Sequence, residues 1–484
     1  MWKSILAFAL GVISVFGYAP WGWFVLPVLA LAVLFWMLRD AMTAREAMRL
    51  GFAFGLGLFS FGVSWVHVSL NQFGGLPLPL AWLAVVLFAV FLALFPALAL
   101  GLAVRLFRPA ARSLALPAFW VLLEGVRGTV LTGFPWLALG YSQVPDSPLA
   151  GYAPVLGVYG VSLLAALSAS LVQRWRGVLW LVLIGVAGAG LKTVHWTQPV
   201  GEPLRVSLLQ GNVAQDMKFH PEHRRQTLRN YLLMAREAEG ELKILPETAL
   251  PLLLSEVPPS YLRALGQTGT VLVGVPEAAD GAYYNSLIWL DPAQQGNCLR
   301  YRKRHLVPFG EFTPPGFGWL ASALHIPFSD FGRGAAVQPP FVVAGQRVAA
   351  NICYEDVFGE ELIAAAREAT LMVNVSNDAW FGPSAAPWQH LQIAQMRALE
   401  TGRWQMRANN TGITAVLDAQ GAVVKQLPPF QLGVLETVAE GRNGLTPYLR
   451  WGNVPVWLLA GLLLLWAWVQ SRPSYRHKTR KWSD

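Results

Sequence analysis

Cysteine and charged side chains are scarce in this chain of 484 residues. It has two cysteines, Cys298 and Cys353, and only 13% of its residues are charged. Two thiols are too few for a disulfide framework or for a cysteine-ligated zinc site. The chain therefore falls outside both the small disulfide-rich proteins and the zinc-cluster proteins.

Several common active-site motifs are also missing. The sequence contains no G-x-S-x-G, no G-x-x-x-x-G-K-[ST] and no G-x-G-x-x-G, so serine-hydrolase, nucleotide-binding and dinucleotide-binding functions have no sequence support. The net charge of +9 is spread over short loops and a basic tail, which suits membrane topology better than a phosphate-binding face. We therefore expect no nucleic-acid partner, no metal and no cofactor.

Long apolar runs are what the chain has in abundance. It is 54% hydrophobic and carries 21 tryptophans, values typical of an integral membrane protein. A helix needs about 20 apolar residues to cross a hydrocarbon core about 30 Å thick. We predict an α-helical membrane bundle of eight spans at 4–20, 23–38, 50–70, 78–104, 113–131, 150–172, 176–194 and 452–470.

Arginines in alternate loops predict the orientation of these spans. They follow the second, fourth and sixth runs, whereas the loops 18–22, 71–79 and 132–149 hold no Lys or Arg. By the positive-inside rule, the arginine-rich loops lie in the cytoplasm. Seven spans then place the stretch after 192 outside, and the eighth span returns the chain to a basic cytoplasmic tail. The arginines are Arg39, Arg45, Arg49, Arg105, Arg108, Arg112, Arg174 and Arg176.

The composition changes at a proline-rich linker, 196–203, after which strands alternate with helices. This alternation indicates an α/β layered domain whose sheets are covered by helices. We predict strands at 204–210, 243–245, 270–275, 284–290, 342–352, 371–375, 404–409 and 414–418, and helices at 221–239, 359–369 and 388–402. The predicted organisation is a seven-span domain 1–196, an extracytoplasmic α/β domain 197–450, an eighth span 451–470 and a tail 471–484.

A few polar and aromatic residues stand out in the membrane half. Glu124 and Arg127 are three residues apart and could pair on one helix face, most simply as a structural ion pair. His67 and Asn71 are expected near an outer interface with structural roles. The Phe-Pro-Trp stretch 134–136 falls in an outer loop, where it could face a lipid substrate or anchor the end of a helix.

Three stretches of the α/β domain carry the candidate chemistry. A β-favouring run ends on Cys353, Glu247 follows a strand end between two prolines, and Lys303 lies in a basic stretch. A cysteine attacks a carbonyl group as a thiolate, so it needs a base or a nearby cation. Glu247 could take the thiol proton, and Lys303 and the backbone N–H of Tyr354 could stabilise an oxyanion. Taken singly, Cys353 fits a buried apolar thiol equally well, and the two charged residues fit surface salt bridges.

Longer motifs around these residues narrow the choice. They read Leu-Gln-Gly-Asn at 209–212, Pro-Glu-Thr-Ala-Leu-Pro at 246–251, Tyr-Asn-Ser at 284–286, Lys-Arg-His-Leu-Val-Pro-Phe-Gly-Glu-Phe at 303–312, Ile-Cys-Tyr-Glu at 352–355 and Asn-Val-Ser-Asn-Asp-Ala-Trp-Phe-Gly at 374–382. Together they resemble the nitrilase superfamily, and more specifically its membrane-embedded apolipoprotein N-acyltransferase family. The resemblance covers essentially the whole chain and implies N-terminal spans, a nitrilase-like αββα sandwich outside the membrane and one C-terminal span.

The resemblance also implies a reaction in two steps. Cys353 would take a fatty acyl chain from a membrane phospholipid as a thioester, and the α-amino group of the N-terminal diacylglyceryl-cysteine of an apolipoprotein would collect it as an amide. Glu247 would be the general base and Lys303 the oxyanion stabiliser, in a protein of the bacterial inner membrane with its catalytic domain on the periplasmic side. Glu311, Tyr354 and Glu355 map onto supporting positions. Candidate substrate-binding positions are Phe134, Trp136, Phe219 (where the family often has tryptophan), Asn285, Trp380 and Phe381.

Three alternatives keep the domain but change its activity. A membrane-tethered amidase would use the same residues to hydrolyse a soluble amide with water as the acceptor. A Cys–His pair would use His305 or His390 as base, and a transporter or scaffold would bind lipoproteins without chemistry. The apolar stretch 312–328 could dip into the membrane as an arm or pack as an ordinary loop. A disulfide between Cys298 and Cys353 would block the nucleophile, so we expect none.

Overall fold

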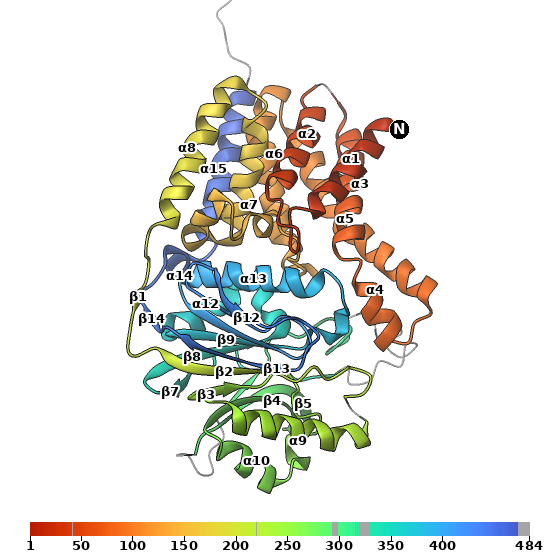
Figure 1. Cartoon of the computed structure of the whole chain (residues 1–484). Coiled ribbons are helices and arrows are strands. Elements are labelled where there is room, and N and C mark those ends of the chain that lie inside the picture. Colours follow the sequence, from red (N-terminus) through yellow and green to blue (C-terminus); the bar gives the residue numbers. More distant parts are fainter. Residues whose placement is uncertain are drawn as a thin grey trace, which may run out of the picture.

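The computed structural model describes residues 1–40, 42–218, 220–292, 299–314, 316, 318 and 330–472. Helices of the first 200 residues and the last helix of the chain gather at one end, and two stacked sheets with covering helices form the other end (Figure 1). The predicted residues Cys298 and Phe219, and most of the predicted arm 312–328, lie outside the described residues.

Each of the eight predicted apolar runs contains a helix. By length and hydropathy, four helices of the described chain could cross a membrane, or five if one bent pair counts as a single span, which is fewer than the eight expected. Several of the others are short, with 13 residues in α2 and 14 in α1. The helices are α1 (Trp2–Val15), α2 (Val25–Met37), α3 (Ala44–Gly62), α5 (Leu78–Leu106), α6 (Arg112–Arg127), α7 (Ala153–Leu171), α8 (Trp175–Lys192) and α15 (Val454–Ser471).

The third run is not the single continuous helix that was expected. Helix α3 ends at Gly62, and the chain bends by 57° into α4 (Val66–Val68) and a π-helical turn that ends at Phe73. The break has a local cause, because the carbonyl oxygen of Gly62 accepts a hydrogen bond from Gln389 Nε2 at 3.2 Å. The bend therefore forms where the α/β domain supplies a partner to the helix backbone.

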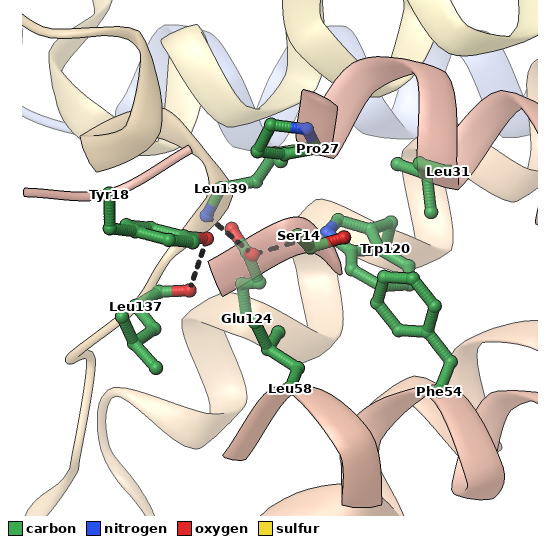
Figure 2. Close-up of a pocket in the computed structure, with 10 residues that line it drawn as sticks. All are labelled: Ser14, Tyr18, Pro27, Leu31, Phe54, Leu58, Trp120, Glu124, Leu137 and Leu139. Carbon is green, nitrogen blue, oxygen red and sulfur yellow. Dashed lines mark hydrogen bonds between the residues drawn. The ribbon is translucent and has the colours of Figure 1, made fainter. Parts of the chain in front are cut away.

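The predicted ion pair between Glu124 and Arg127 is wrong. The Glu124 carboxylate accepts from the backbone N–H of Leu139 at 2.9 Å and from the indole of Trp120 at 3.1 Å (Figure 2). Arg127 donates to the carbonyl oxygens of Phe134 and Trp136 at 2.6 and 2.7 Å. Both side chains satisfy the buried backbone of the loop after α6, which would otherwise lose its hydrogen bonds on leaving water.

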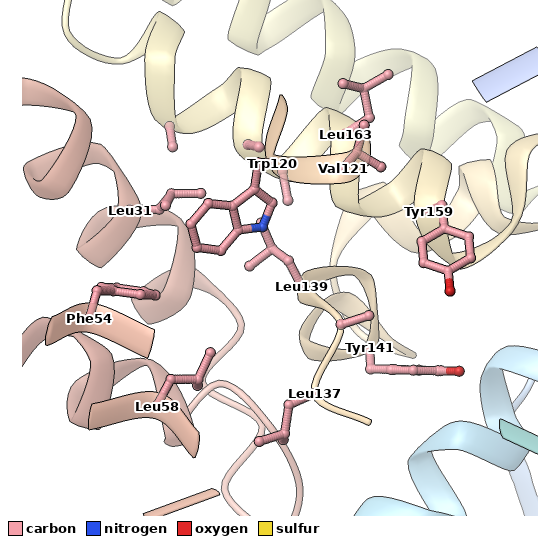
Figure 3. Close-up of a cluster of buried hydrophobic side chains, with 14 of the residues drawn as sticks. Leu31, Phe54, Leu58, Trp120, Val121, Leu137, Leu139, Tyr141, Tyr159 and Leu163 are labelled. Atoms are coloured by element: carbon pink, nitrogen blue, oxygen red, sulfur yellow. The ribbon is translucent and has the colours of Figure 1, made fainter. Parts of the chain in front are cut away.

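The apolar core of the helix bundle continues into the α/β half. Side chains of α2, α3, α6 and α7 interdigitate around Trp120 (Figure 3). The same buried cluster includes Tyr354 and Phe358, which follow Cys353, and Ile393 and Met396 of the helix α13 (Ala386–Thr401). One continuous core thus fixes the α/β half against the bundle.

The second half is the expected αββα sandwich. Two six-stranded sheets, ordered β12-β11-β10-β9-β8-β7 and β13-β2-β3-β4-β5-β6, pack face to face through a buried apolar layer. Helices α9 (Pro221–Glu237) and α10 (Pro259–Gly266) cover the second sheet, and α12 (Gly359–Glu368) and α13 cover the first (Figure 1). The strands are β2 (Leu204–Gln210), β3 (Leu242–Ile244), β4 (Thr270–Ala279), β5 (Ala282–Leu290), β6 (Arg300–Arg302), β7 (Phe341–Val343), β8 (Gln346–Ile352), β9 (Leu371–Ser376), β10 (Trp404–Asn409), β11 (Ala415–Leu417), β12 (Val423–Gln426) and β13 (Gly433–Ala439).

Two strand predictions are wrong. The run 342–352 is a hairpin, because Ala344 and Gly345 both adopt positive φ and turn β7 back onto β8. The chain also continues past the strand 414–418, which was predicted to be the last. Strand β12 extends the first sheet, and β13 crosses to the second sheet and pairs antiparallel with β2.

Candidate active site

Cys353 occupies a tight turn between strand and helix. It directly follows β8, begins the 3-10 turn Cys353–Val357 and adopts a φ of +53°. A side chain other than glycine is strained there by about 1–2 kcal/mol. Asn374 Nδ2 donates to the carbonyl oxygen of Cys353 at 3.2 Å and helps to hold this conformation. The thiol is buried and free, and burial followed by the charge of Glu247 raises its pKa well above the usual value, although Lys303 acts in the opposite direction.

Glu247 is presented by a turn that packs directly against β4. The strand β3 ends at Ile244, and Thr248 takes up a positive φ of 50°. This turn needs the glycine at position 274, since a Cβ there would lie 2.3 Å from the oxygen of Pro246 and 2.8 Å from Glu247 Cα. The missing side chain of Gly274 therefore sets where the carboxylate of Glu247 lies.

Lys303 joins two carboxylates from different parts of the chain. Its Nζ lies 2.9 Å from Glu311 Oε1 and 3.4 Å from Glu247 Oε1, and the side chain is 1% exposed. Burial alone would lower the pKa of Lys303, but Glu311 and Glu247 outweigh it and raise the pKa above the ordinary value. The ammonium therefore stays charged throughout the physiological pH range.

Asn285 closes this arrangement from β5. Its Nδ2 donates to Glu247 Oε1 at 2.7 Å and to Glu311 Oε1 at 2.8 Å. Asn285 and Lys303 thus bridge the same two carboxylates, and Glu311 Oε2 also accepts from the backbone N–H of Val307 at 2.8 Å. The geometry places Asn285 within the candidate site, with its amide nitrogen committed to these two glutamates.

Glu355 joins the lysine stretch to the cysteine turn. One carboxylate oxygen accepts from the backbone N–H groups of Arg304 and His305 at 2.7 and 3.1 Å. The other oxygen accepts from Ile352 N at 2.7 Å and from the hydroxyl of Tyr301 at 2.9 Å. A single buried side chain therefore fixes Lys303 relative to Cys353, as expected of a supporting position.

Tyr354 connects the same turn to the membrane half. Its hydroxyl donates to the carbonyl oxygen of Gly133 at 3.1 Å, in the loop that follows α6. Its ring lies edge-on to Phe358 at 5.2 Å and to His305 at 5.8 Å. The residue after the candidate nucleophile therefore contacts the helix bundle directly.

The two histidines considered as alternative bases have other partners. His390 Nδ1 lies 3.0 Å from Asp378, and its Nε2 lies 2.9 Å from Asp356 and 3.3 Å from the carbonyl oxygen of Cys353. Burial would lower the pKa of His390, but the two aspartates raise it to about 9, so the ring is an imidazolium at neutral pH. His305 Nδ1 lies 3.0 Å from Glu361. Neither arrangement favours a Cys–His pair.

Four fully buried charges lie beneath the cysteine turn. Arg407 donates to Asp356 at 3.1 Å and to Asp378 at 3.2 Å, and His390 lies between the same two aspartates. Two positive and two negative charges balance within this group. Sequence reasoning missed its structural role, because the residues are far apart in the chain and only the fold brings them together.

The four remaining aromatic residues that were predicted to bind substrate differ in how exposed their side chains are. Trp136 is 2% exposed, and its indole donates to Gln389 Oε1 at 2.7 Å, so it anchors the loop after α6 to α13. Phe134 packs edge-on against Phe88 at 4.9 Å, and Phe381 against Trp65 at 4.6 Å. Trp380 is 41% exposed and is held by a hydrogen bond from Ser69 to its carbonyl oxygen at 2.6 Å.

Sequence reasoning also missed Lys218. This lysine is 2% exposed, and its Nζ donates to the carbonyl oxygen of Glu247 at 3.3 Å. The signal was weak, since one lysine in a polar loop is ordinarily solvated. Among the described residues, the structure contains no group of three or more His, Cys, Asp or Glu side chains that could hold a metal ion.

Known proteins resemble both halves of the chain. The profile of the apolipoprotein N-acyltransferase N-terminal domain matches residues 10–171, and that of the carbon-nitrogen hydrolase matches 205–438. Apolipoprotein N-acyltransferase of Nitrosomonas europaea is 49% identical over 96% of each chain. The protein of that name from Ralstonia nicotianae is 46% identical over 96% of this chain and 92% of its own. A solved CN-hydrolase superfamily protein from Xanthomonas campestris aligns with 53% of this chain and 97% of its own at 20% identity and a TM-score of 0.39.

Proposed function

We propose a reaction from one premise: this chain belongs to the apolipoprotein N-acyltransferase family. It is an acyltransferase with a nitrilase-like catalytic domain, and its function is the N-acylation of lipoproteins. The proposal concerns the acyl donor, the covalent intermediate and the residues that act. One observation carries it, namely that Glu247, Lys303 and Cys353 converge from three separate strand ends on one buried site.

In the first step, Cys353 takes an acyl chain from a membrane phospholipid. The thiol proton passes to the Glu247 carboxylate, and the sulfur attacks the ester carbonyl carbon. The carbonyl oxygen becomes an oxyanion that faces Lys303 and the backbone N–H of Tyr354. When the intermediate collapses, the ester C–O bond breaks, Glu247 returns the proton to the departing oxygen, and a lysophospholipid leaves the thioester.

In the second step, the α-amino group of the diacylglyceryl-cysteine attacks the thioester. Glu247 removes a proton from the attacking nitrogen, the C–N bond forms, and the C–S bond breaks. The thiolate that leaves recovers the proton from Glu247, so the enzyme returns to its starting state. The buried ring of Glu247, Asn285, Glu311 and Lys303 supports this assignment, because it holds the base in one place through both steps.

The proposed site lies at the junction of the catalytic domain and the helix bundle. The hydroxyl of Tyr354 reaches the loop after α6, and α13 packs between the first sheet and the membrane helices. This placement supports a donor that stays in the membrane. We further propose the predicted organisation of eight spans in domains 1–196, 197–450, 451–470 and 471–484, with both termini cytoplasmic and the catalytic domain in the periplasm.

Mass spectrometry of the full-length protein purified from membranes tests this function. We expect an acyl mass on the Cys353 peptide of the enzyme, and we expect it to disappear when a diacylated lipopeptide is added. The lipopeptide should then gain one amide-linked acyl chain. Cys353→Ala should lose all three signals, whereas Cys298→Ser should keep them. Lipopeptide acylation by Cys353→Ala would refute the proposal. Hydrolysis of a soluble amide, with no acyl-enzyme formed from phospholipid, would favour the amidase alternative.

A further inference from the structure

Lys218 is a buried charge that forms no ion pair with a carboxylate in the described part of the chain. Buried lysines are rare unless they are paired, yet its one hydrogen bond in the described chain goes to the backbone oxygen of Glu247 at 3.3 Å. Among the described residues, no Asp or Glu lies within the 4.0 Å of an ion pair with Lys218. Lys303 differs sharply, because it shares its charge with both Glu247 and Glu311.

A charge count shows what the unpaired ammonium does. Among the four groups of Lys218, Lys303, Glu247 and Glu311, two positive charges balance two negative charges while Cys353 is a thiol. Once Glu247 takes the thiol proton, Glu311 neutralises Lys303 at 2.9 Å. Of these four groups, Lys218 then holds the positive charge that is not paired with a carboxylate.

The other charges near the cysteine do not replace it. The charge of Asp378 also raises the pKa of Cys353, but Asp378 belongs to the balanced group with Asp356, His390 and Arg407. Lys218 donates to the backbone of the candidate base, and a negative charge on Cys353 would raise the pKa of Lys218. A charge in a buried site acts more strongly than one in water, because little solvent screens it.

We propose that Lys218 is a positioning residue whose positive charge offsets part of the negative charge that develops at Cys353 during the reaction. This inference rests on the proposed function. The hydrogen bond to Glu247 holds the ammonium in place from the loop that follows β2. Burial lowers the pKa of Lys218 to about 8, against the opposing effects of Glu247 and Cys353, so the amine keeps its proton at neutral pH.

The rate of Cys353 alkylation at pH 7, where Lys218 is charged, tests this role without any lipid. The full-length protein in detergent is treated with iodoacetamide at pH 7, and labelling of the Cys353 peptide is followed by mass spectrometry. In Lys218→Met, which is similar in length and uncharged, we expect the rate to fall by about tenfold, because loss of the positive charge lowers the fraction of thiolate. Lys218→Arg should keep the wild-type rate, because it keeps the charge.

Two further variants separate charge from structure. Lys218→Gln can still donate to the Glu247 carbonyl oxygen, so a structural role predicts the wild-type alkylation rate at pH 7 and a charge role predicts the lowered rate. Lys243→Met is the matched control, since Lys243 is also buried and donates to a backbone oxygen, that of Thr268. A wild-type rate in Lys218→Gln would overturn the inference, even if Lys218→Met failed to fold. Failure of the proposed function would appear separately, as a wild-type protein that forms no thioester.

Discussion

The ammonium of Lys303 lies 2.9 Å from Glu311 and 3.4 Å from Glu247. Lys303 is therefore paired chiefly with the glutamate that we do not assign as the base. Because Asn285 donates to both carboxylates as well, Glu311 holds the lysine and the asparagine in place while Glu247 exchanges protons. This division of roles leads to the first of four predictions.

Glu311→Gln should slow acyl-enzyme formation by about 100-fold, a typical size for loss of acid–base function. Without its nearer carboxylate, Lys303 should move onto Glu247 and make that group a weaker base. The rate of thioester formation at Cys353 measures the effect. Glu361→Gln is the control, because Glu361 contacts His305 outside the ring. Equal rates in the two variants would contradict the assigned role of Glu311.

Glu355→Gln should destabilise the protein by about 3 kcal/mol. Each carboxylate oxygen of Glu355 accepts two hydrogen bonds, and the amide of glutamine has only one oxygen that can accept. The amide NH₂ would face two donors and leave both unsatisfied. Thermal unfolding in detergent measures the loss. Glu256→Gln serves for comparison, since the carboxylate of Glu256 is bonded only at an exposed turn. An unchanged unfolding temperature would argue against the clamp between the lysine stretch and the cysteine turn.

Gly274→Ala adds only one methyl group, but we expect it to slow catalysis strongly. The added methyl group would overlap the backbone at Pro246 and Glu247, so the turn must shift, at a cost of about 1–3 kcal/mol. Such a shift would move the Glu247 carboxylate away from Cys353 and slow thioester formation by about 100-fold. Gly185→Ala, in open space on α8, should leave the rate unchanged. If both variants react alike, the close contact with β4 does not position the base.

His390→Gln should change how stability depends on pH. The pKa of His390 is about 9 in the folded protein and about 6.5 when unfolded. Between these values the folded state holds one more proton, so the contribution of His390 is complete below pH 6.5 and is lost as the pH rises through 9. The difference in unfolding temperature between wild type and variant should therefore shrink over this range. A difference that is constant from pH 6 to 9 would mean that His390 is not a buried imidazolium.

Strand ends were the most predictable part of the site. The apolar runs that precede Glu247 and Cys353 indicated strands, and the structure places both residues just past β3 and β8. The geometry also brings Lys303 and Glu311 together, as a spacing of eight residues around a turn allowed. Whether these residues catalyse the reaction remains a prediction that the variants above can test.

The contacts between distant segments could not be predicted. Lys218, Asn285 and His390 each have at least one partner more than 25 residues away in the sequence, and no local pattern shows such a contact. Strand β12 was not predicted for a different reason. All four of its residues are exposed, so the strand lacks the alternation of buried and exposed residues that makes a strand recognisable in a sequence.

Helix α13 has a consequence for how this catalytic domain can be handled. It is 16 residues long and buried on both sides, with Leu391 and Ala398 against the sheet and Ile393 and Met396 against the bundle. Truncation to the α/β half would expose that second apolar side to water, and it would remove the partners of Gln389 in the bundle. A soluble fragment of this enzyme would therefore aggregate unless the bundle-facing side of α13 were redesigned with polar residues.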